Sequence, residues 1–235
     1  MIDRIKLFNE VAQKFPDSVG DDFRDDDLGG CAIKNDFGTY YPKMWEFLVK
    51  QLEIKSVLDV GCGFGYSLDF FVNNLKLDGL GIEGSEKVAN ASPLKDIIKI
   101  HDYRNGEVEI DREFDLCWCC EVVEHIERKD LDALLNTFTK AKYVCMTFAE
   151  PDQSGHHHVN CQPGEYWVGK CYEKGLIVDV PFTQSLREKA REDYEDFQNS
   201  EMEDKQSFVI PHFVTRGIFF NRINPESIKG SDILF

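Results

Sequence analysis

The sequence contains few basic residues for its length, and no long apolar run. It has 27 lysine and arginine residues against 43 aspartate and glutamate residues, which gives a formal net charge of −16. A chain this acidic repels nucleic-acid phosphates unless a local basic patch compensates, and the sequence contains no such patch. No stretch is apolar over the length needed to cross a bilayer. We therefore expect neither a nucleic acid nor a membrane as a partner.

A secretory signal is also missing, since no amino-terminal segment combines a charged start, an apolar middle and a cleavage site. We expect a cytoplasmic, reducing environment, in which the eight cysteines remain thiols. Three of them, Cys117, Cys119 and Cys120, lie in an apolar stretch typical of a buried strand, where a thiol acts as a small hydrophobe. With 235 residues and no internal repeat or low-complexity tract, the chain predicts one α/β domain.

Apolar segments alternate with helical ones along most of the chain. Strands are predicted at about residues 56–60, 79–83, 97–101, 114–120, 143–147 and 176–180, and a last apolar run covers residues 215–221. This alternation is typical of a doubly wound parallel sheet. We divide the single domain, residues 1–235, into an amino-terminal helical or lid region (1–52), a core (53–150), a substrate-side loop with helices (151–205), and a closing strand with tail (206–235).

The most informative motif is VLDVGCGFG at residues 57–65, an apolar strand with an acid near its end and then three glycines. Glycines at this spacing allow a tight turn in which the backbone can approach a ligand closely. The spacing alone is weak evidence, and the alternative is a plain turn between a strand and a helix. Its flanks favour a ligand, because Asp59 precedes the loop and Glu83 ends the next predicted strand about twenty residues later.

These residues resemble the first motif and the ribose-binding acid of class I S-adenosylmethionine-dependent methyltransferases. The resemblance runs from about Val57 to Val180 and implies a Rossmann-like, seven-stranded, mostly parallel sheet with a carboxy-terminal antiparallel strand. It implies S-adenosyl-L-methionine as the cofactor, with Glu83 accepting hydrogen bonds from both ribose hydroxyls. The expected cofactor-binding residues are Asp59, Gly61, Cys62, Gly63, Glu83, Gly84, Asp102, Tyr103, Cys120 and Glu121.

Asp102 and Tyr103 are expected beside the adenine. Asp102 has an alternative role, because an aspartate that opens a turn before Asn-Gly is common.

A second motif, EVVEHI at residues 121–126, opens the helix that we expect after the fourth predicted strand. If this segment is helical, Glu121, Glu124 and His125 share one face, and the loop GHHHVN at 155–160 could add a fourth ligand. Carboxylates mixed with imidazoles suit Mg²⁺, Mn²⁺ or Fe²⁺ better than a structural zinc. The expected metal ligands are Glu121, Glu124, His125 and His158.

The E-x-x-E-H spacing resembles small-RNA 3′-end methyltransferases and the O-methyltransferases of ubiquinone synthesis, in which this motif holds a divalent ion. Many class I methyltransferases carry a similar motif with no metal, and there His125 would only be a packed histidine. In that alternative a histidine has to take the proton from the acceptor. The candidate catalytic residues are therefore His125, His157 and His158, with His156 as a further member of the loop.

The segment after the histidines resembles a bacterial and phage subset associated with polysaccharide modification, as do TYYPKMWEFL and HFVTRGIFFNR. In that case Gln162, Tyr166 and Trp167 line the acceptor side, although core packing explains the two aromatic residues equally well. We expect an O-methyltransferase that acts on a hydroxyl of a sugar or sugar-nucleotide, with a homodimer as the candidate assembly. The alternatives are an RNA or quinone-type O-methyltransferase and a non-catalytic cofactor-binding module.

Overall fold

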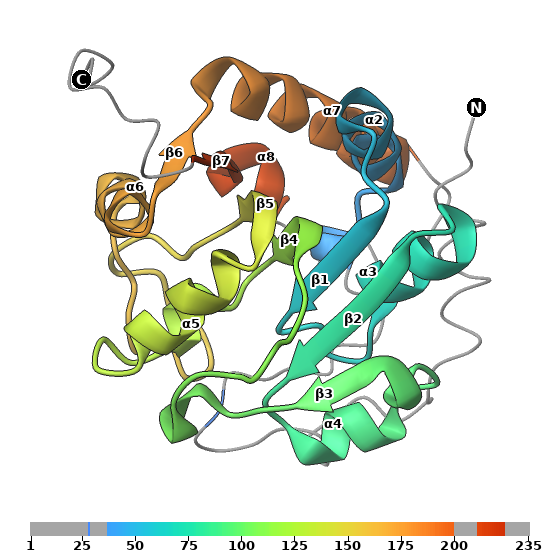
Figure 1. Ribbon diagram of the computed structural model, residues 1–235. Helices are drawn as coiled ribbons and strands as arrows, with labels where there is room; N and C mark the ends of the chain where they lie inside the picture. Colours follow the sequence, from blue (N-terminus) through green and yellow to red (C-terminus); the bar gives the residue numbers. More distant parts are fainter. Residues whose placement is uncertain (1–27, 29–36, 200–210, 224–235) are drawn as a thin grey trace.

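The computed structural model describes residues 28, 37–199 and 211–223 (Figure 1). Seven strands form one sheet in the order β3-β2-β1-β4-β5-β7-β6. The strands are β1 (Ser56–Val60), β2 (Asp78–Glu83), β3 (Ile98–Ile100), β4 (Phe114–Cys119), β5 (Ala141–Met146), β6 (Leu176–Val178) and β7 (Ile218–Arg222). Strand β7 lies between β5 and β6 and runs antiparallel to both, and the other pairs are parallel. The predicted fold class is confirmed.

The helices cover both faces of this sheet. They are η2 (Phe37–Thr39), α2 (Pro42–Leu52), α3 (Tyr66–Asp69), the π-helical η3 (Phe70–Asn74), α4 (Glu86–Ala91), η4 (Lys95–Ile97), η5 (Tyr103–Asn105), η6 (Val123–His125), α5 (Leu131–Phe138), α6 (Gly164–Glu173), α7 (Val180–Gln198) and α8 (His212–Arg216). Most of the amino-terminal region and all of the tail after residue 223 lie outside the described residues.

Two hydrophobic clusters lie on opposite faces of the sheet, because successive strand residues point to opposite sides. Val57 joins the cluster formed with α2, η3, α7 and α8, whereas Leu58 joins the cluster formed with α5 and α6. Trp45 of α2 is fully buried, and its ring meets Trp118 of β4 edge to face at 5.5 Å. The packing of both faces fixes where the carboxyl ends of the strands lie.

The carboxyl ends of β1, β2, β4 and β5 meet at one edge of the sheet (Figure 1). The glycine loop leaves β1 there, and the segment 121–125 leaves β4 beside it. Helix α8 arrives at the same edge, because it directly precedes β7 and Ile218 pairs with Met146. In open α/β sheets ligands bind at this edge.

The helix that we expected to open at Glu121 does not form. Glu121 has a left-handed backbone with φ of 56°, only the short turn η6 follows, and α5 begins at Leu131. Backbone groups of this segment bond elsewhere: the Glu121 N–H donates to Thr147 Oγ1 (2.7 Å), and the Glu124 carbonyl accepts from the N–H groups of Val159 and Asn160. Thr147 and the histidine loop therefore bond to backbone groups of Glu121 and Glu124 that a longer helix would have used.

Candidate active site

The glycine loop is a tight turn pinned to the end of β2. The N–H groups of Gly61 and Cys62 both donate to the Ile82 carbonyl, at 2.8 and 3.0 Å. Gly61 and Gly63 have φ values of 67° and 56°, a conformation that residues with a side chain rarely adopt. A Cβ atom at Gly61 would lie 2.3 Å from Val122 Cγ2, whereas one at Gly63 would meet nothing within 4 Å. The loop thus packs against the segment after β4 at Gly61 and is open at Gly63.

Glu83 joins this loop to β2. Its carboxylate accepts the Gly63 N–H at one oxygen and the Ser85 N–H at the other, both at 2.8 Å. Both oxygens of the carboxylate are thus held by main-chain N–H groups, one from the loop and one from the start of α4. The acid predicted to hold a ribose is therefore oriented by the loop itself.

Asp59 supports the loop from the core side. Its side chain is 1% exposed and accepts a hydrogen bond of 2.6 Å from Ser67 Oγ in α3. Burial raises the pKa of Asp59 to about 7, against the opposing effect of the Ser67 hydrogen bond. Cys62 is buried too, with its sulfur against Gly81. The structure thus places these two predicted site residues beneath the loop, where they hold its shape.

The predicted adenine side contains one accessible residue and one buried residue. Asp102 accepts hydrogen bonds from Arg104 N and Nε and so opens the turn η5, as the alternative interpretation proposed. Tyr103 is 6% exposed and belongs to the core cluster beneath α5, so its ring does not face the sheet edge. Gly84 is partly exposed and lies against the side chain of Leu28.

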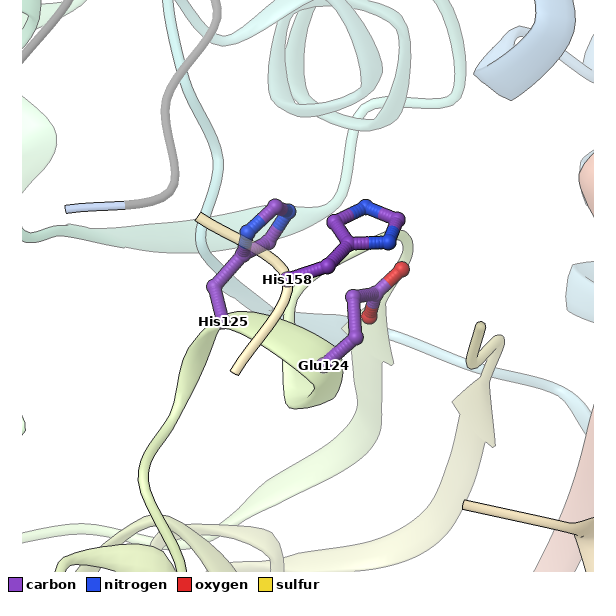
Figure 2. A group of neighbouring side chains, drawn as sticks. All are labelled: Glu124, His125 and His158. Carbon is purple, nitrogen blue, oxygen red and sulfur yellow. The ribbon is translucent and has the colours of Figure 1, made fainter. Parts of the chain in front are cut away.

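Three of the four predicted metal ligands come together beside η6. One ligand atom each of Glu124, His125 and His158 lie within 4.8 Å of one another, although the segments are more than 30 residues apart (Figure 2). His125 Nδ1 bonds to the His157 carbonyl and His158 Nδ1 bonds to the Gln153 carbonyl, both at 3.1 Å. These bonds orient both rings and leave each Nε2 as the nitrogen that can bind a ligand.

Glu124 is a buried carboxylate without a hydrogen-bond donor in the described part of the chain. Its side chain is 0% exposed, and neither carboxylate oxygen has a partner there. Burial and the nearby charge of Glu121 raise the pKa of Glu124 well above its usual value. Burial also lowers the pKa of His125 to about 4, so that its imidazole stays neutral. A carboxylate that has no partner among the described residues, beside two imidazoles, is a donor set that suits a divalent cation.

Glu121, the fourth predicted ligand, is bound elsewhere. Its carboxylate accepts from Thr147 Oγ1 (2.8 Å) and lies 2.7 Å from His212 Nδ1, outside the group of Glu124, His125 and His158. Cys120, which we placed at the cofactor, is partly buried and its sulfur lies 3.6 Å from Thr147 Oγ1. His157 takes part through its main chain, which adopts φ of 51°.

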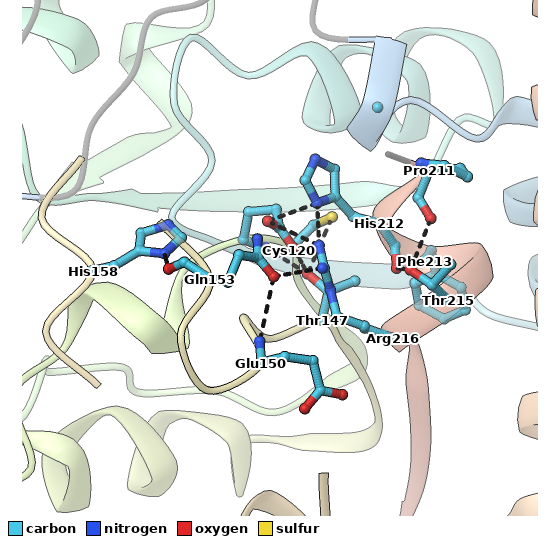
Figure 3. A network of polar contacts seen from close by, with 12 residues as sticks. Cys120, Thr147, Glu150, Gln153, His158, Pro211, His212, Phe213, Thr215 and Arg216 are labelled. Carbon is cyan, nitrogen blue, oxygen red and sulfur yellow. Dashed lines mark hydrogen bonds and ion pairs between the residues drawn. The ribbon is translucent and has the colours of Figure 1, made fainter. Parts of the chain in front are cut away.

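Sequence reasoning missed His212, Arg216 and Gln153. Arg216 Nη1 donates to Gln153 Oε1, and Arg216 Nη2 lies 2.7 Å from His212 Nδ1 and 3.7 Å from Glu121 Oε2 (Figure 3). His212 and Arg216 lie in the closing segment that carries a resemblance to known proteins. No spacing rule links that segment to β4, so no local signal could have selected the two residues.

Solved structures share this architecture. The plantazolicin methyltransferase BpumL, solved with a triazolic desmethylPZN analog and SAH, superposes with a TM-score of 0.57 at 13% identity, over 81% of this chain and 87% of that one. The methyltransferase domain of the bacterial protein CtHen1 gives a TM-score of 0.50 at 17% identity, over 77% and 96% of the two chains. These likenesses show the fold.

Residues 58–141, which include the glycine loop, β2 and the segment after β4, match the model of a family described as a methyltransferase domain. Residues 58–141 thus form the methyltransferase domain of this protein. The interpretation as a non-catalytic module is therefore dropped. No curated protein sequence matches the methyltransferase. In the described ranges, none of its helices combines the length and the apolar character that a membrane span requires.

Proposed function

We propose that the methyltransferase transfers the methyl group of S-adenosylmethionine to a hydroxyl of a sugar or sugar-nucleotide, with a divalent cation held by Glu124, His125 and His158. The observation that carries this proposal is the group formed by these three side chains at the sheet edge that also holds the glycine loop. A hydroxyl needs help to lose its proton near neutral pH, and this group supplies a means of doing so.

The donor would lie along the glycine loop. Glu83 would bind the ribose hydroxyls through its carboxylate, which the N–H groups of Gly63 and Ser85 orient. The main chain of Gly61 and Gly63 would approach the cofactor, and Gly84, Asp102 and Glu121 would border it. The complexes of BpumL with SAH support this choice of cofactor.

Two observations indicate that Glu124, His125 and His158 could hold a cation. The Glu124 carboxylate is fully buried and neither oxygen has a partner within the described ranges, which is costly unless a proton or a cation compensates. The two imidazoles are already oriented by main-chain carbonyls, each of which contacts the Nδ1 atom of its ring. When bound, a divalent ion would lower the pKa of a coordinated hydroxyl and orient it. Glu124, His125 and His158 would hold it, whereas Glu121 would not.

We infer the class of the methyl acceptor from the net charge of the chain and from the side chains that follow the histidine loop. The net charge of −16 disfavours RNA as the acceptor, which favours a small molecule. Of the expected aromatic pair, Trp167 is 0% exposed and donates its Nε1–H to the Gln162 carbonyl, so it packs in the core. Tyr166 is only partly buried and has Arg128 5.8 Å from its ring centroid. We retain Tyr166 and Gln162 as acceptor-side residues.

The ion is tested by the substitution Glu124→Gln, which preserves shape and removes one carboxylate. We expect the affinity for Mn²⁺ to fall by more than about 100-fold, since even indirect neighbours of a ligand matter by roughly 10–100-fold. Calorimetric titration of the metal-stripped protein with Mn²⁺ measures this, and SAH binding should stay unchanged. Glu150→Gln is the matched control, because it removes the same charge from an exposed side chain at the same edge. Equal Mn²⁺ affinity in both variants would exclude Glu124 as a ligand.

The acceptor is tested with a panel of sugar nucleotides, quinols and short RNA, incubated with S-adenosylmethionine and Mn²⁺ and scored by mass. We expect a mass increase of one methyl group on a sugar nucleotide, and loss of the product when the ion is chelated. Methylation of a quinol or of RNA alone would replace the proposed acceptor. Homodimerisation and a cytoplasmic location remain predictions, and light scattering tests the first.

A further inference from the structure

Helix α8 brings an imidazole to the carboxylate that follows β4. His212 Nδ1 lies 2.7 Å from Glu121 Oε2, while Glu121 Oε1 accepts from Thr147 Oγ1 at 2.8 Å. Burial acts to raise the pKa of Glu121, but His212, Arg216 and Thr147 together lower it, so the carboxylate stays ionised. An ionised carboxylate on one imidazole nitrogen orients the ring and stabilises its protonated form.

This pair lies beside the glycine loop. Val122 follows Glu121 directly, and its methyl groups occupy the space where a Cβ of Gly61 would stand. The His212 side chain is 21% exposed, and its Nε2 has no partner in the described ranges. Figure 3 shows the ring with one nitrogen in the polar network and the other directed away from it. The Nε2 atom therefore points away from the polar network, at the edge where the methyl donor is proposed to bind.

Arg216 sets the second contact of the same ring. Its Nη2 lies 2.7 Å from His212 Nδ1, and its Nη1 donates to Gln153 Oε1. The charged groups that contact His212 in the described part of the chain are Glu121 and Arg216. Nδ1 can either donate to Glu121 or accept from Arg216, and only the first choice leaves a lone pair on Nε2. The two contacts are therefore alternatives with opposite consequences for the chemistry of the ring.

We propose that His212, held through Nδ1–H by Glu121, is the catalytic base that removes the acceptor proton at Nε2. This inference rests on the proposed function, because it requires a hydroxyl acceptor. As the acceptor O–H bond breaks, its proton moves to Nε2 and an oxygen lone pair attacks the methyl carbon. The carbon–sulfur bond breaks, and its electron pair stays on sulfur to give neutral S-adenosylhomocysteine. The imidazolium then releases its proton to solvent. Arg216 acts as a positioning residue through Glu121, whose Oε2 lies 3.7 Å from its Nη2.

Two amide substitutions separate this role from a structural one. His212→Asn places its amide N–H near the position of Nδ1 and so can keep the bond to Glu121, but it has no group at Nε2. His212→Gln places its amide nearer the position of Nε2. We expect both variants to lose about 10²–10⁴-fold in kcat on the acceptor found with the panel, with unchanged SAH affinity. Thr215→Ala, an exposed change on the same helix, is the control and should retain the wild-type rate. A structural role predicts instead that His212→Asn is active, and this result would overturn the proposal.

The tautomer of His212 can be measured without a methyl-accepting substrate. Nitrogen-15 spectra of the imidazoles in the SAH-bound protein, at pH 8, should show His212 with a proton on Nδ1 and none on Nε2, and Glu121→Gln should disturb that signal. A proton on Nε2 would show that Nδ1 accepts a hydrogen bond from Arg216, and this result would refute the proposed role of His212 as a base. If no panel member is methylated while the expected tautomer is present, the proposed acceptor class fails and His212 remains poised as a base.

Discussion

Alanine substitutions at Gly61 and Gly63 should have different effects on the stability of the protein and on its affinity for the cofactor product S-adenosylhomocysteine (SAH). Both residues have positive φ values, 67° and 56°, so alanine at either position costs about 1–2 kcal/mol for a left-handed backbone. At Gly61 the new Cβ would also stand 2.3 Å from Val122 Cγ2, and such overpacking typically costs about 1–3 kcal/mol more. We therefore expect Gly61→Ala to lose about 2–5 kcal/mol of unfolding free energy, and Gly63→Ala about 1–2 kcal/mol.

Binding should respond in the opposite order. The Cβ of Gly63→Ala would project into open space where the adenosine is proposed to lie, beside the N–H that binds Glu83. We expect its SAH affinity to fall at least about tenfold, which corresponds to about 1.4 kcal/mol. Urea unfolding followed by circular dichroism measures the first quantity, and calorimetric titration with SAH measures the second. The double variant Gly61→Ala with Val122→Ala should recover part of the lost stability, because it removes the atoms that clash.

Three results would refute this reasoning. Equal loss of stability in the two single variants would mean that Val122 does not confine Gly61. Failure of Val122→Ala to relieve Gly61→Ala would mean the same. Wild-type SAH affinity in Gly63→Ala would show that the cofactor does not approach the loop at that residue.

Two further predictions concern the acids around the loop. Burial raises the pKa of Asp59 from 3.8 to about 7. Between these two pH values the folded state therefore binds more protons than the unfolded state. The contribution of Asp59 to the unfolding free energy consequently falls as the pH rises from about 4 to about 7. Asp59→Asn keeps an acceptor for Ser67 and should remove a pH-dependent loss of up to about 4 kcal/mol, measured by urea unfolding at pH 4 and pH 8; identical slopes in both proteins would contradict the assigned pKa. Glu83→Gln should weaken SAH binding by about 1–3 kcal/mol in calorimetry, because the ribose loses charged acceptors, whereas the exposed Glu86→Gln should bind as the wild type does. Unchanged affinity in Glu83→Gln would remove this residue from the cofactor site.

The strands could be predicted because each is a local apolar pattern. The predicted first strand, residues 56–60, matches β1 at both ends, and the second differs from β2 by one residue. The helix predicted after β4 was wrong, because apolar spacing does not report the hydrogen bonds that Thr147 and the histidine loop offer to residues 121–124. Trp167 was ambiguous for a similar reason, since an aromatic residue near a site has the same local pattern whether it packs in the core or lines the surface.

The sequence by itself determined the order of strands and helices, the glycine loop with Glu83, and the residue types of a mixed carboxylate and imidazole site. These features depend on short-range spacing, because the backbone links their residues within one turn or one strand–helix unit. Only the tertiary structure decided that Glu124, His125 and His158 form one group, that Glu121 leaves it, and that His212 and Arg216 join the site from the other end of the chain. Such contacts depend on where the packed sheet brings strand ends together, and that position is a property of the whole core.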